Sequence, residues 1–223
     1  MIRRIYDAVY QNLIGGGAYL RIIKGCVFTL LICVLALCVA GVLAAGLSFL
    51  RTSEKKLLRR IGVAVTFLTK GTPVYLALLL WYYTFLGGMH RGGLLIAVLV
   101  FGLYGGGHLT DILTRGVKKE TSRRNAAVNR RARREFFSAL LPFVTEQSLF
   151  EIKRLVCILL QMSSVVGVIG VNDLTRVMLA NGLRTRFPFF ALFCAVIFYL
   201  VLQLLVEALF ANIGKKLTGE AEE

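Results

Sequence analysis

The sequence contains few of the residues that enzymes most often use for chemistry. It has two histidines, the isolated His90 and His108, and 12 Asp and Glu residues among 223. It shows no glycine-rich phosphate-binding loop of the Walker type and no paired nucleophile and base. No group of His, Cys, Asp and Glu has the spacing of a metal site. We therefore expect a chain that is not an enzyme and that binds neither metal nor cofactor.

The five cysteines all lie in apolar runs and lack the spacing of a disulfide framework. Cys26 and Cys33 are two helical turns apart, but no histidine or acid in that helix completes a metal site. We interpret all five as small buried hydrophobic residues. The first apolar run is too long for a cleavable signal peptide and has no convincing small-residue cleavage site.

The chain is rich in apolar residues. It is 57% hydrophobic, with a mean hydropathy of +0.72, whereas soluble domains average about 45–50% apolar residues. Cys26–Leu50 is a run of 25 residues without a charge, and about 20 such residues span the roughly 30 Å hydrocarbon core of a bilayer. The composition therefore indicates an all-α polytopic membrane protein with one transmembrane domain, residues 1–223.

The charge is strongly unbalanced, with 27 Lys and Arg and a net charge of +15. In a soluble protein this charge would suggest nucleic acid as a partner. In a membrane protein, Lys and Arg gather in cytoplasmic loops. Stacking aromatics are not interleaved with the charges, as single-stranded nucleic acid would require. We therefore expect contact with membrane lipids and no nucleic-acid partner.

The apolar runs predict five transmembrane helices. Their expected bounds are 22–50, 73–87, 93–115, 150–171 and 187–211. Residues 1–14 are expected to form an interfacial helix, because their apolar residues share one helical face, and Gly15–Gly17 should end it. The second span is short, so part of 61–70 should also lie at membrane depth. Residues 172–186 are expected to be a polar loop.

The distribution of positive charge predicts the orientation. An odd number of spans places the two ends of the chain on opposite sides. The loops 51–70 and 115–154 and the C-terminal tail contain 19 of the Lys and Arg residues, and the other side contains 8. The positive-inside bias therefore places the N-terminus outside, and the C-terminus and the basic loop 116–149 in the cytoplasm. Within that loop, apolar residues recurring every four positions predict a helix with one apolar face: Ala132, Phe136, Leu140 and Val144.

Polar side chains form stripes at helical spacing within three of the predicted spans. Four of them are candidates for lining a translocation path: Asp111, Gln161, Ser164 and Gln203. Asp111 and Arg115 are four residues apart and are expected to neutralise each other. Because Asp111 lies near a helix end, where side chains reach water easily, a structural role is favoured for it. For Gln161 and Gln203, helix–helix hydrogen bonding and path lining stay equally open.

Several short motifs resemble the polar-amino-acid permeases, the membrane subunits of type I ABC importers. Lys70 to Pro73 resembles the R-G-T-P segment, and Leu109–Val117 resembles A-E-x-x-R-G-G-I, with Asp111 in place of the glutamate. Val168–Arg176 resembles V-I-G-V-x-E-L-T-R, and Gly25 and Thr29 fit the pattern of the opening helix. The resemblance covers about residues 15–212. The matching motif residues are Gly71, Thr72, Pro73, Gly116, Pro142, Gly170, Asp173, Thr175 and Arg176.

This resemblance implies a fold, partners and a mechanism. Two permease subunits, identical or different, would pair in a bacterial cytoplasmic (inner) membrane, each as a multi-pass protein. Each would rest a cytoplasmic coupling helix on an ABC ATPase subunit, which binds the ATP and Mg²⁺. An extracytoplasmic solute-binding protein would deliver a polar amino acid. ATP binding would then rock the permeases between inward- and outward-facing states, without chemistry in this chain.

The coupling loop departs from the pattern that this resemblance predicts. Asn125, Ala126 and Ala127 are the nearest match to E-A-A-x-x-x-G, and no glycine follows. Arginines crowd the segment instead, so the candidate ATPase-coupling residues are Arg123, Arg124, Asn125, Ala126, Ala127, Arg130, Arg131, Arg133, Arg134 and Phe136. The departure motivates an alternative function, a non-transporting scaffold or regulatory membrane subunit of such a complex.

Overall fold

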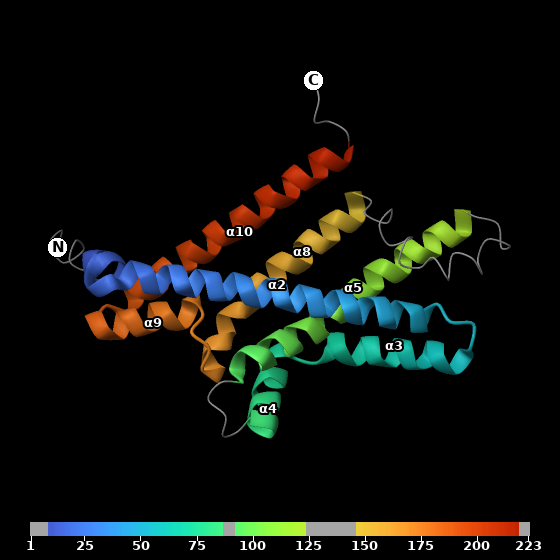
Figure 1. Cartoon of the computed structure of the whole chain (residues 1–223), viewed down its shortest axis with the longest axis horizontal. Helices are drawn as coiled ribbons and strands as arrows, with labels where there is room; N and C mark the ends of the chain where they lie inside the picture. The colour runs from blue at the N-terminus through green and yellow to red at the C-terminus, as the bar shows by residue number, and fades with distance from the viewer. Residues whose placement is uncertain (1–8, 87–91, 124–145, 219–223) are drawn as a thin grey trace.

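The computed structural model describes residues 9–86, 92–123 and 146–218, and these residues contain helices and no strands. Short turns η1 (Tyr10–Ile14) and η2 (Gly15–Gly17) come first. The longer helices follow as α2 (Ala18–Arg51), α3 (Lys56–Gly71), α4 (Val74–Leu86), α5 (Gly93–Arg123), α8 (Glu146–Met162) with the 3-10 turn η5 (Ser163–Ile169), α9 (Leu174–Thr185) and α10 (Pro188–Thr218). Figure 1 shows their arrangement.

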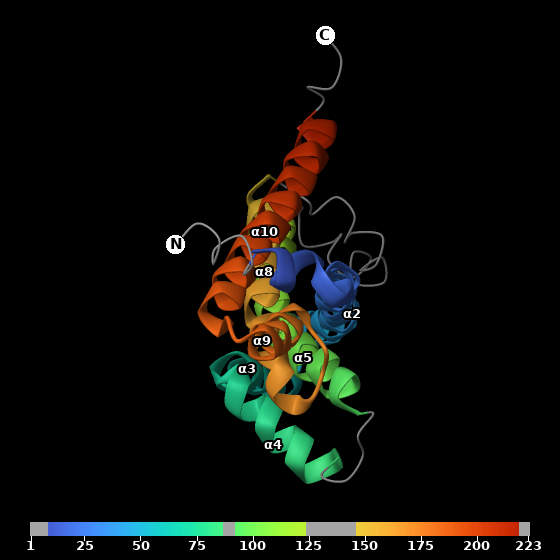
Figure 2. The same cartoon turned by 90° about the vertical axis from the view of Figure 1, so that its left-hand side faces the viewer.

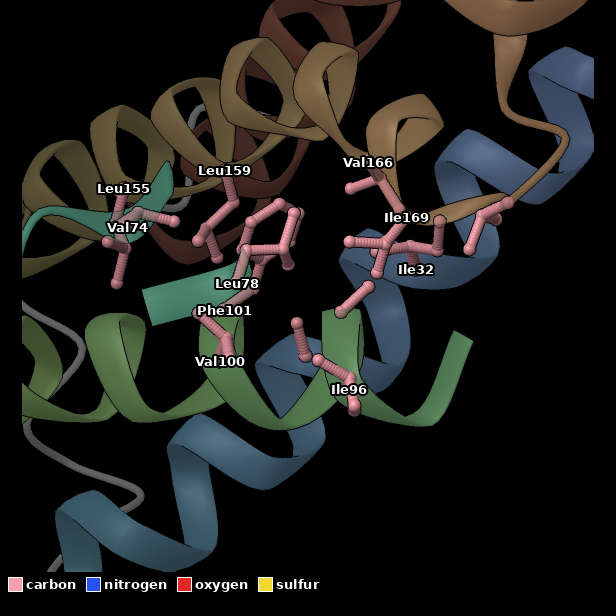
Figure 3. Close-up of a cluster of buried hydrophobic side chains, with 13 residues drawn as sticks. Ile32, Val74, Leu78, Ile96, Val100, Phe101, Leu155, Leu159, Val166 and Ile169 are labelled. Carbon is pink, nitrogen blue, oxygen red and sulfur yellow. The ribbon is translucent and has the colours of Figure 1, made fainter. Parts of the chain in front are cut away.

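The long helix α2 holds the bundle together. Its 34 residues make it about 51 Å long at 1.5 Å per residue, so it exceeds a roughly 30 Å hydrocarbon core and must tilt or project from it. Ile32 of α2 belongs to a cluster with α4, α5, α8 and η5 that includes Leu78, Phe101 and Leu159 (Figure 3). Cys33, the next residue, belongs to a second cluster with α8, α9 and α10. α2 therefore contributes to both cores.

The candidate membrane spans agree with the five predicted passes. Four helical stretches are long and apolar enough to cross a membrane: Tyr10–Arg51, Gly93–Gly116, Ser148–Ile169 and Pro188–Lys215. The fifth is the pair α3 and α4, which qualifies only when its two helices are taken together and which bends by 96°. α4 alone has 13 residues and is about 20 Å long. In both views α4 extends away from the other helices (Figures 1 and 2).

The bend between α3 and α4 has a local cause. The residue before a proline is pushed out of the helical region, because the proline ring crowds its backbone. Thr72 precedes Pro73 and has the extended angles φ −76° and ψ 125°. α3 therefore ends at Gly71, and the chain turns before α4 begins at Val74.

The structure corrects some of the expected boundaries. Residues 172–186 are not a polar loop, because Leu174–Thr185 forms the helix α9. The predicted basic loop 116–149 is helical at both ends, since α5 continues to Arg123 and α8 begins at Glu146. The break at Gly15–Gly17 is confirmed: Gly16 and Gly17 have φ angles of +60° and +69° before α2 begins at Ala18. Of the predicted interfacial helix 1–14, only residues from 9 onward are described.

Side-chain contacts define two ends of the bundle. At one end, Arg51 of α2 contacts Asp111 of α5, and Leu149 of α8 lies beside Gly214 of α10. At the other end, Arg21 of α2 contacts Asn181 of α9. We call the first the ion-pair end and the second the motif end. The helix ends that adjoin the strongly basic loops thus lie at the ion-pair end, and those that adjoin the less basic connections lie at the motif end.

Candidate translocation and coupling site

Asp111 is the centre of the ion-pair end. Its two carboxylate oxygens accept hydrogen bonds from different helices, one from the guanidinium of Arg51 and the other from the Lys70 ammonium. The three side chains are between 20% and 33% exposed, so water screens them only partly. Both cations lie in the last turn of their helices, where positive charge is favoured by the helix dipole. Asp111 therefore ties the ends of α2 and α3 to α5.

A glycine in α5 lets α3 approach closely enough for this contact. Gly107 lies one turn before Asp111, and a Cβ at its position would lie 2.5 Å from Thr69 Oγ1 and 2.8 Å from Lys70 Cγ. Any larger residue would push the last turn of α3 away from α5. Gly107 thus brings Lys70 to Asp111, as expected of a glycine used for close helix packing.

The expected pair between Asp111 and Arg115 is wrong. Arg115 instead donates to the carboxylate of Glu151, and so links α5 to α8. Its side chain is 64% exposed, which makes this the more screened contact. Residues four apart on one helix pair only when no better partner reaches them from another helix, and here three helices, α2, α3 and α8, supply such partners.

The deeper path candidates join α8 to α10. The Nε2 of Gln161 donates to Oε1 of Gln203 over 3.1 Å, and Gln203 reaches Glu207 over 3.4 Å. The Ser164 hydroxyl donates to the backbone carbonyl of Gln161 over 2.7 Å. These contacts show the helix–helix hydrogen bond that the sequence left open. Path lining by Asp111, Gln161, Ser164 and Gln203 stays a prediction.

The motif end brings residues of two separate motifs into contact. A Cβ at Gly25 would lie 3.0 Å from Leu174 Cα and 3.3 Å from its backbone nitrogen, so the glycine lets α9 begin directly against α2. The backbone N–H of Leu174 donates to Oγ1 of Thr29 over 3.2 Å. Residues 145 positions apart in the chain thus meet. This contact between two distant motifs was not predicted from the sequence.

Asp173 organises the start of α9. It is fully buried, and its carboxylate accepts from the backbone N–H groups of Thr175 over 3.0 Å and Arg176 over 3.2 Å. Burial raises the pKa of Asp173, and these two backbone donors only partly offset that effect. The hydroxyl of Thr175 lies 3.0 Å from that of Tyr199 in α10. The carboxylate therefore acts as an N-cap, and Thr175 ties α9 to α10.

Two further motif residues shape the turn before α9. Gly170 has a φ angle of +87°, a conformation that residues with a Cβ rarely adopt. Arg176 donates to the backbone carbonyl of Gly167 over 3.1 Å, closing the turn. Gly170, Asp173, Thr175 and Arg176 thus have local structural roles in one connection, which joins the end of η5 to α9.

A small cavity adjoins the bend between α3 and α4. Its volume is about 160 Å³, and Thr72, Trp81 and Tyr104 are among the residues that line it. The Tyr104 ring packs on His108, with 4.6 Å between the ring centroids. The motif residues Gly71, Thr72 and Pro73 thus form the bend beside this cavity, and Gly116 lies within α5.

Most of the predicted ATPase-coupling residues lie outside the described residues. Arg123 ends α5, and the others fall in the segment 124–145: Arg124, Asn125, Ala126, Ala127, Arg130, Arg131, Arg133, Arg134 and Phe136. Pro142 and the expected apolar face of that segment lie there too. The helices on either side, α5 and α8, both reach the ion-pair end.

The described residues contain no group of three or more His, Cys, Asp and Glu side chains that could hold a metal ion. All five cysteines lie within this part of the chain and are free, and Cys38 is exposed. The prediction that all five cysteines are buried is confirmed for Cys33, Cys157 and Cys194, but it is wrong for Cys38, and Cys26 is only partly buried.

No protein-family model matches the chain. The histidine/lysine/arginine/ornithine transport system permease protein HisM of Escherichia coli K12 is 26% identical over 210 residues, which cover 86% of this chain and 87% of HisM. HisM of Shigella flexneri matches equally. A crystal structure of an amino acid ABC transporter with histidines matches with a TM-score of 0.66, over 88% of this chain and 94% of that chain, at 19% identity.

The chain has the fold of an amino-acid ABC transporter permease. The structural match covers nearly the full length of both chains, and the resemblance noted from the motifs is confirmed by the similarity to HisM. The protein is therefore a multi-pass membrane protein with this fold. The fold also explains the residues that the sequence analysis missed, since Arg51, Lys70 and Asn181 gain their partners only when distant helices pack.

Proposed function

We propose that this chain is the permease subunit of an ABC importer that moves a polar amino acid across a bacterial inner membrane by alternating access. The observation that carries the proposal is the match in fold over 94% of a chain of a solved amino acid ABC transporter. The similarity to HisM over 86% of this chain supports it independently. ATP would bind with Mg²⁺ and be hydrolysed in a separate ATPase subunit, which drives the two conformations.

The two ends suggest how motion would pass through the subunit. The segment 124–145, with its arginines, would rest on the ATPase and pull on α5 and α8, which the Arg115–Glu151 pair already joins. Asp111 would pass this movement from α5 to α2 and α3. The opposite end, where α9 is fixed to α2 and α10, would then move with α2. Gln161, Ser164 and Gln203 stay candidates for the translocation path.

The direction of the chain in the membrane follows from its charge. The ion-pair end is adjacent to the basic segment, so the positive-inside bias places it in the cytoplasm and the motif end outside. A reporter enzyme that is active only in the cytoplasm, fused after Glu223, should be active. The same fusion after residue 186 should be inactive. The reverse pattern would overturn the orientation.

The partners follow from the same proposal. A second permease, an ABC ATPase and an extracytoplasmic solute-binding protein would complete the transporter, in contact with membrane lipids and without nucleic acid. HisM is named for histidine, lysine, arginine and ornithine, so cationic amino acids are the first solutes to test. The comparisons give no support to a non-transporting scaffold over the permease.

The test is purification of the tagged chain from its native membrane in mild detergent. An ABC ATPase should accompany it. Reversal of Arg130, Arg131, Arg133 and Arg134 to Glu should release the ATPase while leaving membrane insertion intact. The control reverses Lys55 and Lys56, which are exposed residues at the start of α3, and this variant should retain the ATPase. Release by both variants, or by neither, would contradict docking through the basic segment.

A further inference from the structure

A second and larger cavity opens at the motif end, between α2 and α9. Its volume is about 460 Å³. Six polar residues line it together with Phe28, Val177 and Ala180: Arg21, Lys24, Asn172, Arg176, Asn181 and Arg184. We call it the basic cavity. Four of its lining residues carry a positive charge, and none carries a negative one.

The cations of the basic cavity are not neutralised by carboxylates of the described residues. Within the described residues, all ion pairs lie at the ion-pair end, away from the basic cavity. Arg21, Arg176 and Arg184 instead donate to the backbone carbonyls of Gly16, Gly167 and Gln11, over 3.0 to 3.2 Å. A carbonyl fixes the direction of an arginine but leaves its charge uncompensated. The cavity therefore has the electrostatics of an anion site.

A buried amide supplies an unused donor in the wall of the cavity. Asn181 is 3% exposed, and its Oδ1 accepts from Arg21 Nε over 3.2 Å. Because arginine can only donate, the amide oxygen must face it, and the Nδ2 group faces elsewhere. This Nδ2 has no hydrogen-bond partner among the described residues. Buried donors are rarely left unpaired, and Asn181 belongs to the wall of the cavity, so this wall contains a polar group whose hydrogen bonds the described residues do not complete.

The position along α2 places the cavity at the level of lipid headgroups. Lys24 lies two residues before the charge-free run Cys26–Leu50, which as a helix is longer than the hydrocarbon core is thick. Tyr19 is 51% exposed nearby, as in an aromatic belt. Ile23 and Val27 are 56% and 57% exposed on the same stretch of α2. A ligand with a charged head and apolar chains would thus meet cations and apolar surface together.

We propose that the basic cavity binds the phosphodiester headgroup of an anionic phospholipid. The phosphate oxygens would accept from Lys24 and from the guanidinium groups of Arg176 and Arg184, and the acyl chains would lie along the exposed face of α2. The proposal depends neither on the transport function nor on the direction of the chain in the membrane. It concerns a lipid site, which is separate from the proposed path for the solute.

The test is lipid binding to the purified protein, together with any subunits that accompany it, measured by native mass spectrometry. Phosphatidylglycerol should bind more tightly than phosphatidylcholine. Lys24→Gln should weaken phosphatidylglycerol binding about five-fold and Lys24→Glu about 25-fold, from roughly 1 kcal/mol per charge near the membrane surface. Lys24 is the residue to change, because it is exposed and makes no hydrogen bond or ion pair with the other described residues. Lys56→Gln removes an equal exposed charge at the opposite end and should have no effect.

Each other outcome would overturn the lipid assignment. Equal binding of the two lipids, or equal losses in Lys24→Gln and Lys56→Gln, would show only general attraction to anionic membranes. Displacement of the lipid by millimolar inorganic phosphate, with the phosphate bound in its place, would make the site one for a free anion. A Lys24→Glu variant that loses an acidic partner protein but keeps its lipid would make the cavity a protein-docking surface. Uptake and ATPase co-purification report on the transport function separately.

Discussion

The two ends of the bundle use positive charge in different ways. At the ion-pair end, Arg51, Lys70 and Arg115 each meet a carboxylate from another helix. At the motif end, Arg21, Arg176 and Arg184 donate to backbone carbonyls. There α9 is joined to α2 and α10 by a close glycine contact and by hydroxyl groups. The cations at the ion-pair end are neutralised by carboxylates within the fold. The cations at the motif end are not neutralised by the described residues and remain available to a ligand. The role of a basic residue in this protein therefore depends on whether its partner in the fold is a carboxylate or a backbone carbonyl.

The largest effect should come from removing the carboxylate that two cations share. Asp111→Ala would leave Arg51 and Lys70 adjacent and uncompensated, since both now pair with it. Loss of one partner of a fully buried pair costs about 3–5 kcal/mol, and partial exposure reduces the expected loss to about 2–3 kcal/mol. Thermal unfolding in detergent would measure it, and added salt should shrink the difference. Glu151→Ala, which breaks the more exposed pair, should cost under about 1 kcal/mol. Equal losses of stability in Asp111→Ala and Glu151→Ala would contradict the claim that Asp111 ties α2 and α3 to α5.

A packing change should test the motif end without altering charge. Gly25→Ala would place a methyl group 3.0 Å from Leu174 Cα, and because the neighbour is backbone it can move only with α9. Overpacking of this kind costs about 1–3 kcal/mol. Gly41→Ala lies in the same helix with nothing within 4 Å of the added carbon, and should stabilise slightly by restricting the unfolded chain. The Gly25→Ala loss should not change with salt. A salt-dependent loss would mean that charge also holds this end together.

The cap of α9 should give a smaller and pH-dependent effect. Asp173→Ala removes the acceptor for two backbone N–H groups and should cost about 1–2 kcal/mol. Asp173→Asn keeps an acceptor and should cost less. Because burial raises the folded-state pKa of Asp173 above its unfolded value, the native state binds more protons between these two values. The stability of the wild type relative to Asp173→Asn should therefore rise as pH falls through this window. A relative stability that rises with pH would mean that burial does not dominate the pKa.

The smallest effect should come from the end of α9. Arg186 adopts a left-handed conformation with φ of +63°, and the Phe187 N–H closes the helix end on the Gly182 carbonyl over 2.9 Å. Glycine adopts this conformation without strain, so Arg186→Gly should stabilise by about 0.5–1 kcal/mol. Arg186→Ala removes the same charge but keeps the Cβ, and should show no such gain. A gain in both variants would assign the effect to charge.

The sequence predicted the passes well because long apolar runs have few alternatives in a membrane. It missed α9, whose residues are more polar, although Asp173 before Leu174 and the apolar Val177 and Met178 form an N-cap and a helical face that were open to recognition. Asp111 was assigned the wrong partner, because its true partners lie 60 and 41 residues away. Packing at that distance has no local signal. The basic cavity was unpredictable for the same reason, since α2 and α9 must meet to form it.

The most direct measurement of the central claim is uptake of labelled histidine, lysine, arginine and glutamine by cells with and without this chain. The account predicts that removing the chain abolishes ATP-dependent uptake of at least one of these solutes, and that restoring the intact chain recovers it. The Arg130, Arg131, Arg133 and Arg134 reversal should not recover it. If the intact chain binds its ATPase but its removal leaves the uptake of all four amino acids unchanged, the result would contradict the permease and favour a scaffold.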